Sequence, residues 1–228
     1  MYWDDTGFLI SKNKYNENAV IAEIYTLDHG KCSGVIYGGT SRKIKSYLQL
    51  GNKMFVNYKS KNESKIGYFN VEIIEAISPY FFDNKLKILI LISAVNILKT
   101  LTPELQKNIN IYNSFLNLID YLKKEKRNII LDYIHWELDL IKEIGFDLDL
   151  RKNFFNNINN DELINIDIDG ENHNLPSFIF NRSSMPINDK HIYYALNFIS
   201  NYIHKKILIP NNLFYPRYRN HLQNLYKQ

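Results

Sequence analysis

The chain has 228 residues and a mass of 27.0 kDa, which suits one large domain or two small ones. Its single cysteine, Cys32, excludes an intramolecular disulfide framework and a multi-cysteine zinc site, and it fits a reducing, cytoplasmic compartment. The net charge of +4 is modest, but residues 31–65 carry eight basic side chains against a single acid, Glu63. A basic excess confined to one region raises the question of a polyanionic partner.

The first 78 residues predict β structure, because short segments rich in β-branched and aromatic residues recur there between turn signals. The expected strands are residues 6–11, 19–26, 31–37, 53–60 and 67–77. Five short strands in so short a segment predict a small closed barrel of the OB type, since closure removes exposed sheet edges. No secretory signal is expected, because Asp4 and Asp5 stand where a basic and then an apolar start would be needed.

After Pro79 the hydrophobic period becomes helical. The uncharged apolar run over residues 88–98 is too short for a bilayer, which needs ~20 residues, so we expect a buried helix and no membrane contact. Pro103 suits the first turn of a second helix that reaches about residue 124. A third helix, over residues 128–144, should end at Gly145 as a C-cap.

The remaining third of the chain predicts a hairpin and two more helices. Alternating isoleucines and the turn Asp169-Gly170 predict the hairpin. Asp189 is the expected N-cap of a helix to about residue 206, and a short helix follows Pro216. The fold class is therefore α+β. We expect an OB-fold domain over residues 1–79 and an α-helical domain over residues 80–228, within which residues 146–187 are irregular apart from the hairpin.

No motif for catalysis or for a metal is found. The EF-hand pattern places Asn165, Asp167 and Asp169 on ligand positions, but Pro176 stands where the bidentate Glu is required. Gly-x-Ser-x-Gly, His-Glu-x-x-His and Walker-type phosphate loops are all missing from the sequence. We therefore expect no enzyme activity and no cofactor, although a site assembled from distant residues stays open.

The basic segment 38–52, GGTSRKIKSYLQLGN, has two open interpretations: a solvated strand-and-loop face, or a surface that binds nucleic acid. The second has physical support, because cations that follow phosphates and rings that stack on bases together bind single strands. Aromatic residues are interleaved here, with Phe55 expected in the core and Tyr58 on the opposite, outer face. The expected DNA-binding residues are Arg42, Lys43, Lys45, Lys31, Lys53, Lys59 and Tyr58.

Three segments, WDDTGFLI, AVIAEIYTLDHGK and GGTSRKIKSYLQLGN, resemble in that order the amino-terminal domain of the RecO family of DNA repair proteins. Residues 136–150, 193–207 and 215–222 are similar to later parts of the same family, so the resemblance covers nearly the whole chain. The corresponding residues of the first domain are Trp3, Gly7, Thr26, His29, Gly30, Gly38, Ser41, Arg42, Lys43, Leu48, Gln49 and Gly51.

The resemblance implies an OB-fold domain followed by an α-helical domain, and a recombination mediator that catalyses no chemical step. Such proteins bind single- and double-stranded DNA and anneal complementary strands. They also contact the acidic tail of the single-stranded DNA-binding protein (SSB), and with RecR they help load recombinase on SSB-coated DNA. The resemblance also implies that the protein is cytoplasmic and associated with the nucleoid. Some members carry a four-cysteine zinc site, but residues 153–175 here have no cysteine, so zinc is not expected.

In the helical domain, a partner's acidic tail could be bound by basic side chains beside apolar grooves. The candidates are Arg127, Lys205, Lys206, Arg217 and Arg219. One of the last two could instead stabilise the terminal helix. Two competing interpretations of the whole chain stay open: a scaffold whose barrel binds only protein, and a small enzyme with a non-local site.

Overall fold

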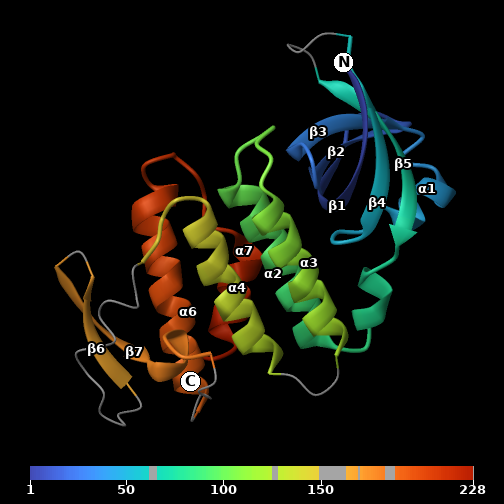
Figure 1. Cartoon of the computed structure of the whole chain (residues 1–228). Helices are drawn as coiled ribbons and strands as arrows, with labels where there is room; N and C mark the ends of the chain where they lie inside the picture. Colours follow the sequence, from blue (N-terminus) through green and yellow to red (C-terminus); the bar gives the residue numbers. More distant parts are fainter. Residues whose placement is uncertain (62–65, 125–127, 149–162, 169, 183–187, 228) are drawn as a thin grey trace. The chain divides into compact units, whose positions relative to one another are not determined.

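The computed structural model describes residues 1–61, 66–124, 128–148, 163–168, 170–182 and 188–227. The chain divides into two compact units, Met1–Glu125 and Lys126–Gln228 (Figure 1). The fold class is α+β, as predicted. No helix in the described ranges is both long enough and apolar enough to cross a bilayer.

The first unit begins with a closed barrel in the strand order β1-β2-β3-β5-β4. Antiparallel pairing of β4 with β1 closes it, while β3 and β5 pair in parallel. This order, with a short helix between β3 and β4, is that of the predicted OB fold. The strands are β1 Tyr2–Lys14, β2 Ala19–Thr26, β3 Gly30–Tyr37, β4 Lys53–Lys59 and β5 Gly67–Glu75.

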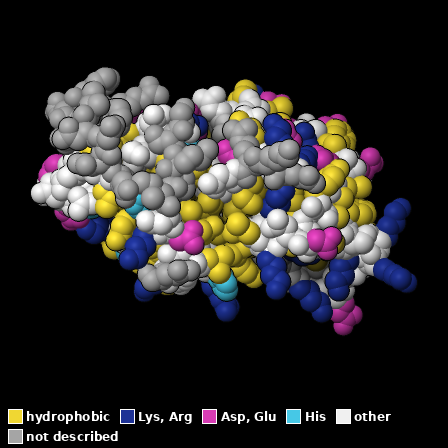
Figure 2. All heavy atoms as spheres, turned by 90° about the horizontal axis from the view of Figure 1, so that it is seen from below, with side chains coloured by type: hydrophobic (Ala, Val, Ile, Leu, Met, Phe, Trp, Pro, Cys, Tyr) yellow, Lys and Arg dark blue, Asp and Glu magenta, His cyan; other side chains and the backbone are white. Residues whose placement is uncertain are grey.

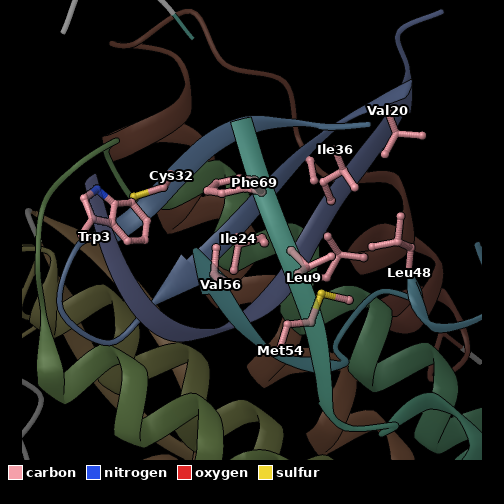
Figure 3. Packing of buried hydrophobic residues seen from close by; sticks show 12 residues of the cluster. Trp3, Leu9, Val20, Ile24, Cys32, Ile36, Leu48, Met54, Val56 and Phe69 are labelled. Carbon is pink, nitrogen blue, oxygen red and sulfur yellow. The ribbon is translucent and has the colours of Figure 1, made fainter. Parts of the chain in front are cut away.

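The barrel interior is filled by alternate side chains of the strands, among them Leu9, Ile24 and Met54, each with none of its surface exposed (Figure 3). On β4 the inward positions continue with Val56 and Tyr58. Phe55 is only half-buried and points the other way, so the prediction of a core Phe55 and an outward Tyr58 is wrong. Alternation of period two fixes which residues share a face, but not which face is buried.

Burial also controls the chemistry of Cys32, which lies inside the barrel with 1% of its surface exposed. Burial raises the pKa of the Cys32 thiol to about 12, so the reactive thiolate is scarce at neutral pH. We expect a thiol-specific disulfide reagent at pH 8 to leave Cys32 unmodified in the folded protein and to modify it fully after denaturation. Rapid modification under native conditions would mean that this part of the barrel opens.

Two helices follow the barrel within the first unit. After the 3₁₀ turn η1 Ser78–Phe81, they are α2 Lys85–Leu101 and α3 Ile109–Lys123. The side chain of Asn108 caps α3 by accepting from the backbone N–H of Ile111. The expected start at Pro103 is wrong, because the intervening segment bonds to β3 instead: the N–H of Leu105 donates to the carbonyl of Lys31.

The second unit contains α4 Ile129–Glu143, the hairpin β6 Leu163–Ile168 and β7 Glu171–Pro176, and α6 Asp189–Ile203. Gly145 ends α4 in the left-handed region at φ +95°, as predicted. The cap of α6 is Asn188, one residue before the predicted Asp189. Shorter elements complete the unit: η2 Ser177–Ile179, the π-helical η3 His204–Leu208 and the predicted last helix, α7 Arg217–Asn224.

The chain changes from strand to helix between β5 and α2. The predicted domain boundary between residues 79 and 80 stays a prediction. Much of the subregion predicted to be irregular, residues 149–162 and 183–187, lies outside the described residues, as does Asp169 of the predicted turn.

Candidate nucleic-acid interface

The basic segment is a short helix, α1 Arg42–Tyr47, where a loop was expected. Its start is set by Ser41, whose Oγ accepts from the N–H of Ile44 at 3.4 Å. Ile44, Tyr47 and Leu48 recur at the spacing of one helix face, and all three pack against the barrel core. Packing of that apolar face therefore turns the polar face of α1 outward.

The outward face of α1 is basic. Arg42, Lys43 and Lys45 are exposed, and none of them forms an ion pair with the part of the chain that the structure describes. Figure 2 shows basic side chains projecting at the right, on the barrel unit, with few acidic side chains among them. Exposed cations gathered on one short helix form a surface that attracts phosphates.

Lys12 of β1 adds a fourth cation to this face. Its ammonium donates to the carbonyl of Leu48, the residue that ends α1. Burial lowers the pKa of the Lys12 ammonium, and the positive charge of Lys45 lowers it further. The two ammonium groups therefore interact electrostatically. Lys12 lies thirty positions before α1 in sequence, and no local pattern indicates it. Lys12, Arg42, Lys43 and Lys45 are called the α1 cation cluster below.

The two ends of the basic segment are held rigidly within the first unit. Gly38 leaves β3 at φ +69°, which a side chain would disfavour, and Gly51 has φ +84° with the side chain of Leu91 close by. The buried Asn52 donates to the carbonyl of Tyr47 at 2.9 Å and accepts from the N–H of Ile77 at 2.7 Å. The position of α1 on the barrel is therefore fixed from both sides.

A second feature lies on the outer face of the strands. Lys59 of β4 stands opposite Tyr2 of β1 and Tyr68 of β5, and its ammonium lies 5.3 Å from the centre of the Tyr2 ring. The Tyr68 ring lies 6.3 Å from that of Tyr37, the last residue of β3. The four side chains form a tyrosine–lysine row across β3, β5, β4 and β1. Tyr37 leads directly into the turn before α1.

Three other predicted DNA-binding residues belong neither to the α1 cation cluster nor to the tyrosine–lysine row. The ammonium of Lys31 donates to the carbonyl of Lys99 at 2.9 Å, and Lys53 lies over the Phe8 ring at the opposite end of β4 from Lys59, roughly 20 Å along the strand. Tyr58 stacks on Trp3 at 4.7 Å, so no face of its ring is offered to a base from outside. We leave these three out of the candidate interface.

The predicted partner-binding residues of the second unit also differ in burial and in ion pairing. Arg219 is fully buried and paired with Glu137, so its guanidinium is not open to a partner in this structure. Lys205 pairs with Glu171 at 2.8 Å. Lys206 and Arg217 are exposed, and Arg127 lies outside the described residues. Among the residues that the structure places, no three His, Cys, Asp or Glu side chains gather closely enough to hold a metal ion.

Two protein-family models match the chain. The model described as Recombination protein O N terminal matches residues 1–77, and Recombination protein O C terminal matches residues 86–162, so together they cover more than half of the chain.

Curated relatives agree with the family models. A DNA repair protein RecO of Wolbachia pipientis subsp. Culex pipiens is 31% identical over 152 residues, which are 67% of this chain and 62% of the relative. One of Rickettsia felis is 33% identical over 148 residues, 65% of this chain and 61% of the relative. One of Wolbachia pipientis wMel is 26% identical over 226 residues, 99% of this chain and 84% of the relative. The first of these matches spans less than two thirds of the relative's own length.

Proposed function

Because the chain belongs to the RecO family of DNA repair proteins, we propose that it is a recombination mediator that binds DNA and anneals complementary strands. It acts by binding alone and catalyses no chemical step. The protein would be located in the cytoplasm, associated with chromosomal DNA. The observation that carries the proposal is the exposed basic face of α1 on an OB-fold barrel, whose cations form no ion pair with the residues that the structure describes.

Phosphate contacts explain both binding and annealing. Cations that meet phosphates carry no sequence information, so the α1 cation cluster should hold single and double strands of any sequence. Binding of this kind weakens as salt rises, because each contact releases condensed counterions. A cationic surface also lowers the repulsion between two polyanions, so complementary strands can approach and pair without nucleotide hydrolysis.

The second unit offers a surface for an acidic partner. A hollow of about 260 Å³ lies between the hairpin and α6, where the apolar Ile168 and Phe198 adjoin Lys206 and the ion pair of Lys205 with Glu171, which an acidic partner would have to replace. Apolar walls beside ammonium groups suit a short peptide that carries both hydrophobic and acidic residues. We propose that this surface receives the acidic tail of SSB, and that the protein works with RecR to load recombinase on SSB-coated DNA.

The experiment that tests this function is strand annealing in a buffer with a chelator and no nucleotide. We expect the protein to accelerate pairing of complementary oligonucleotides, both naked and coated with full-length SSB. Coating with SSB that lacks its acidic tail should remove the acceleration, because the protein is then no longer recruited. No acceleration of naked strands would contradict the proposed mediator.

The competing proposal is an OB-fold scaffold whose barrel binds only protein. The same oligonucleotides distinguish it in a gel-shift measurement at two salt concentrations. A mediator should bind them, more weakly at the higher salt, whereas a scaffold should leave them unbound at both.

A further inference from the structure

We propose that the outer face of the barrel holds a site for an unpaired nucleotide, formed by Tyr2, Lys59, Lys61 and Tyr68 and continued by Tyr37. This inference rests on the proposed DNA binding and adds the form of DNA that the surface selects. The α1 cation cluster meets phosphates, which single strands and duplexes share. The tyrosine–lysine row offers rings, and the bases of a single strand are free to stack on them.

The site is hollow and open to solvent. A depression of about 580 Å³ is lined by Met1, Tyr2, Lys59, Lys61 and Tyr68, together with Ser60. This volume lies within the roughly 300–1,000 Å³ that small-molecule sites occupy. A single base with its sugar and phosphate therefore has room to enter it.

The rings of the tyrosine–lysine row, of which Tyr2 and Tyr68 border the hollow, are exposed to a degree that a folded barrel does not require. Tyr2 is 60% exposed, Tyr37 65% and Tyr68 42%, although aromatic side chains gain most from burial. The planes of Tyr37 and Tyr68 are tilted by 59°, so the two rings do not cover each other's faces. Each ring can therefore take one base on its own face.

Charge complements the rings. Lys59 and Lys61 both border the hollow, and Lys59 already lies over the Tyr2 ring. A base on Tyr68 would bring its phosphate towards these two ammonium groups, which combines stacking with ion pairing in one nucleotide. The carboxylate of Asp4 accepts from the hydroxyl of Tyr2 at 3.3 Å. That bond engages the hydroxyl at the edge of the ring and not its flat faces, one of which Lys59 covers.

A duplex cannot use this site in the same way. Its bases are already paired and stacked, and exposing one face costs a few kcal/mol per base. We therefore assign affinity for any DNA to the α1 cation cluster and preference for single strands to the tyrosine–lysine row.

The test compares three ligands of equal length: oligothymidylate, an abasic strand with the same number of phosphates, and a duplex. Tyr37→Ala with Tyr68→Ala should weaken binding of oligothymidylate by roughly 5- to 150-fold for each stacking contact that is lost. Binding of the abasic strand and the duplex should stay within about twofold of the unmodified protein, because the phosphate contacts remain.

Three controls keep the test interpretable. Tyr37→Phe with Tyr68→Phe retains the rings and should bind oligothymidylate normally. Tyr80→Ala removes an equally exposed tyrosine, 63%, outside the row and should change nothing. If the double variant unfolds at a lower temperature than the unmodified protein, Tyr37→Ala alone is compared with it instead.

The outcomes separate this site from the proposed function. Equal binding of oligothymidylate and the abasic strand by the unmodified protein would overturn the nucleotide site while leaving DNA binding intact. An equal loss on all three ligands in the alanine variants would do the same. No binding to any ligand would overturn the proposed function and the site together.

Discussion

Replacing Arg42, Lys43 and Lys45 together by glutamine is expected to weaken single-strand binding about 100-fold at about 0.1 M salt. Each phosphate contact adds about 0.7 to the slope of log affinity against log salt, which is about fivefold per contact at that concentration. The three side chains are exposed and unpaired with the described chain, so their loss removes contacts to DNA without leaving a buried group unsatisfied. The slope itself should fall by about 2.

The matched control removes the same charge elsewhere. Lys85, Lys190 and Lys227 are also exposed, and glutamine at these positions changes the net charge equally. That variant should keep most of its affinity and its slope. Equal losses in the two triple variants would mean that net charge, and not the face of α1, binds DNA. Arg42→Lys should bind almost normally if the contact needs only charge.

A second large effect is expected from the buried ion pair of the second unit. Arg219→Met alone should lower the free energy of unfolding by about 3–5 kcal/mol, because it leaves the Glu137 carboxylate buried without its counter-charge. Both side chains have no exposed surface, and the guanidinium donates to the two carboxylate oxygens at 2.6 and 2.9 Å. Chemical denaturation followed by circular dichroism measures the loss.

The surrounding contacts explain why this pair is well formed. The hydroxyl of Tyr133 donates to Glu137 at 2.7 Å, and Arg219 also donates to the carbonyl of Leu196 at 3.0 Å. Burial opposes the charge on Arg219, but Glu137, together with Tyr215 and Tyr133, more than offsets it, so the pKa of the guanidinium is raised. The pair thus joins α4, α6 and α7 into one unit.

The double variant Glu137→Leu with Arg219→Met provides the control. It removes both charges and fills part of their space with apolar atoms, so it should be more stable than Arg219→Met alone. A double variant that loses the sum of the two single effects would show that the side chains act independently. DNA binding by the first unit should be unchanged in all of these variants.

The sequence predicted the barrel strands well because their signals are local. The second strand was expected at residues 19–26 and is β2 Ala19–Thr26, where apolar residues are bounded by turn residues on both sides. The helix α1 was missed for the opposite reason. Six residues are too few to be helical on their own, and α1 depends on packing against the barrel and on the bond from Lys12.

The residues that carry the family resemblance are mostly structural. Asp5 accepts from the N–H groups of Thr6 and Asp28 and contacts the His29 ring at 2.9 Å, while Trp3 stacks on that ring at 4.0 Å. They fix the start of β1 against the turn after β2. The motif shared with the family therefore identified the fold. No such motif indicated that the tyrosines of the tyrosine–lysine row are exposed.

By itself the sequence determined the barrel strands and most of the longer helices, the family, and the region in which basic residues outnumber acids. These follow from neighbouring residues and from composition. The tertiary structure alone decided which cations are available: Lys31 is bonded to a helix end, Arg219 is buried, and Arg42, Lys43 and Lys45 of α1 are exposed. The physical reason is that burial and pairing depend on distant partners, such as Glu137, which lies 82 positions before Arg219.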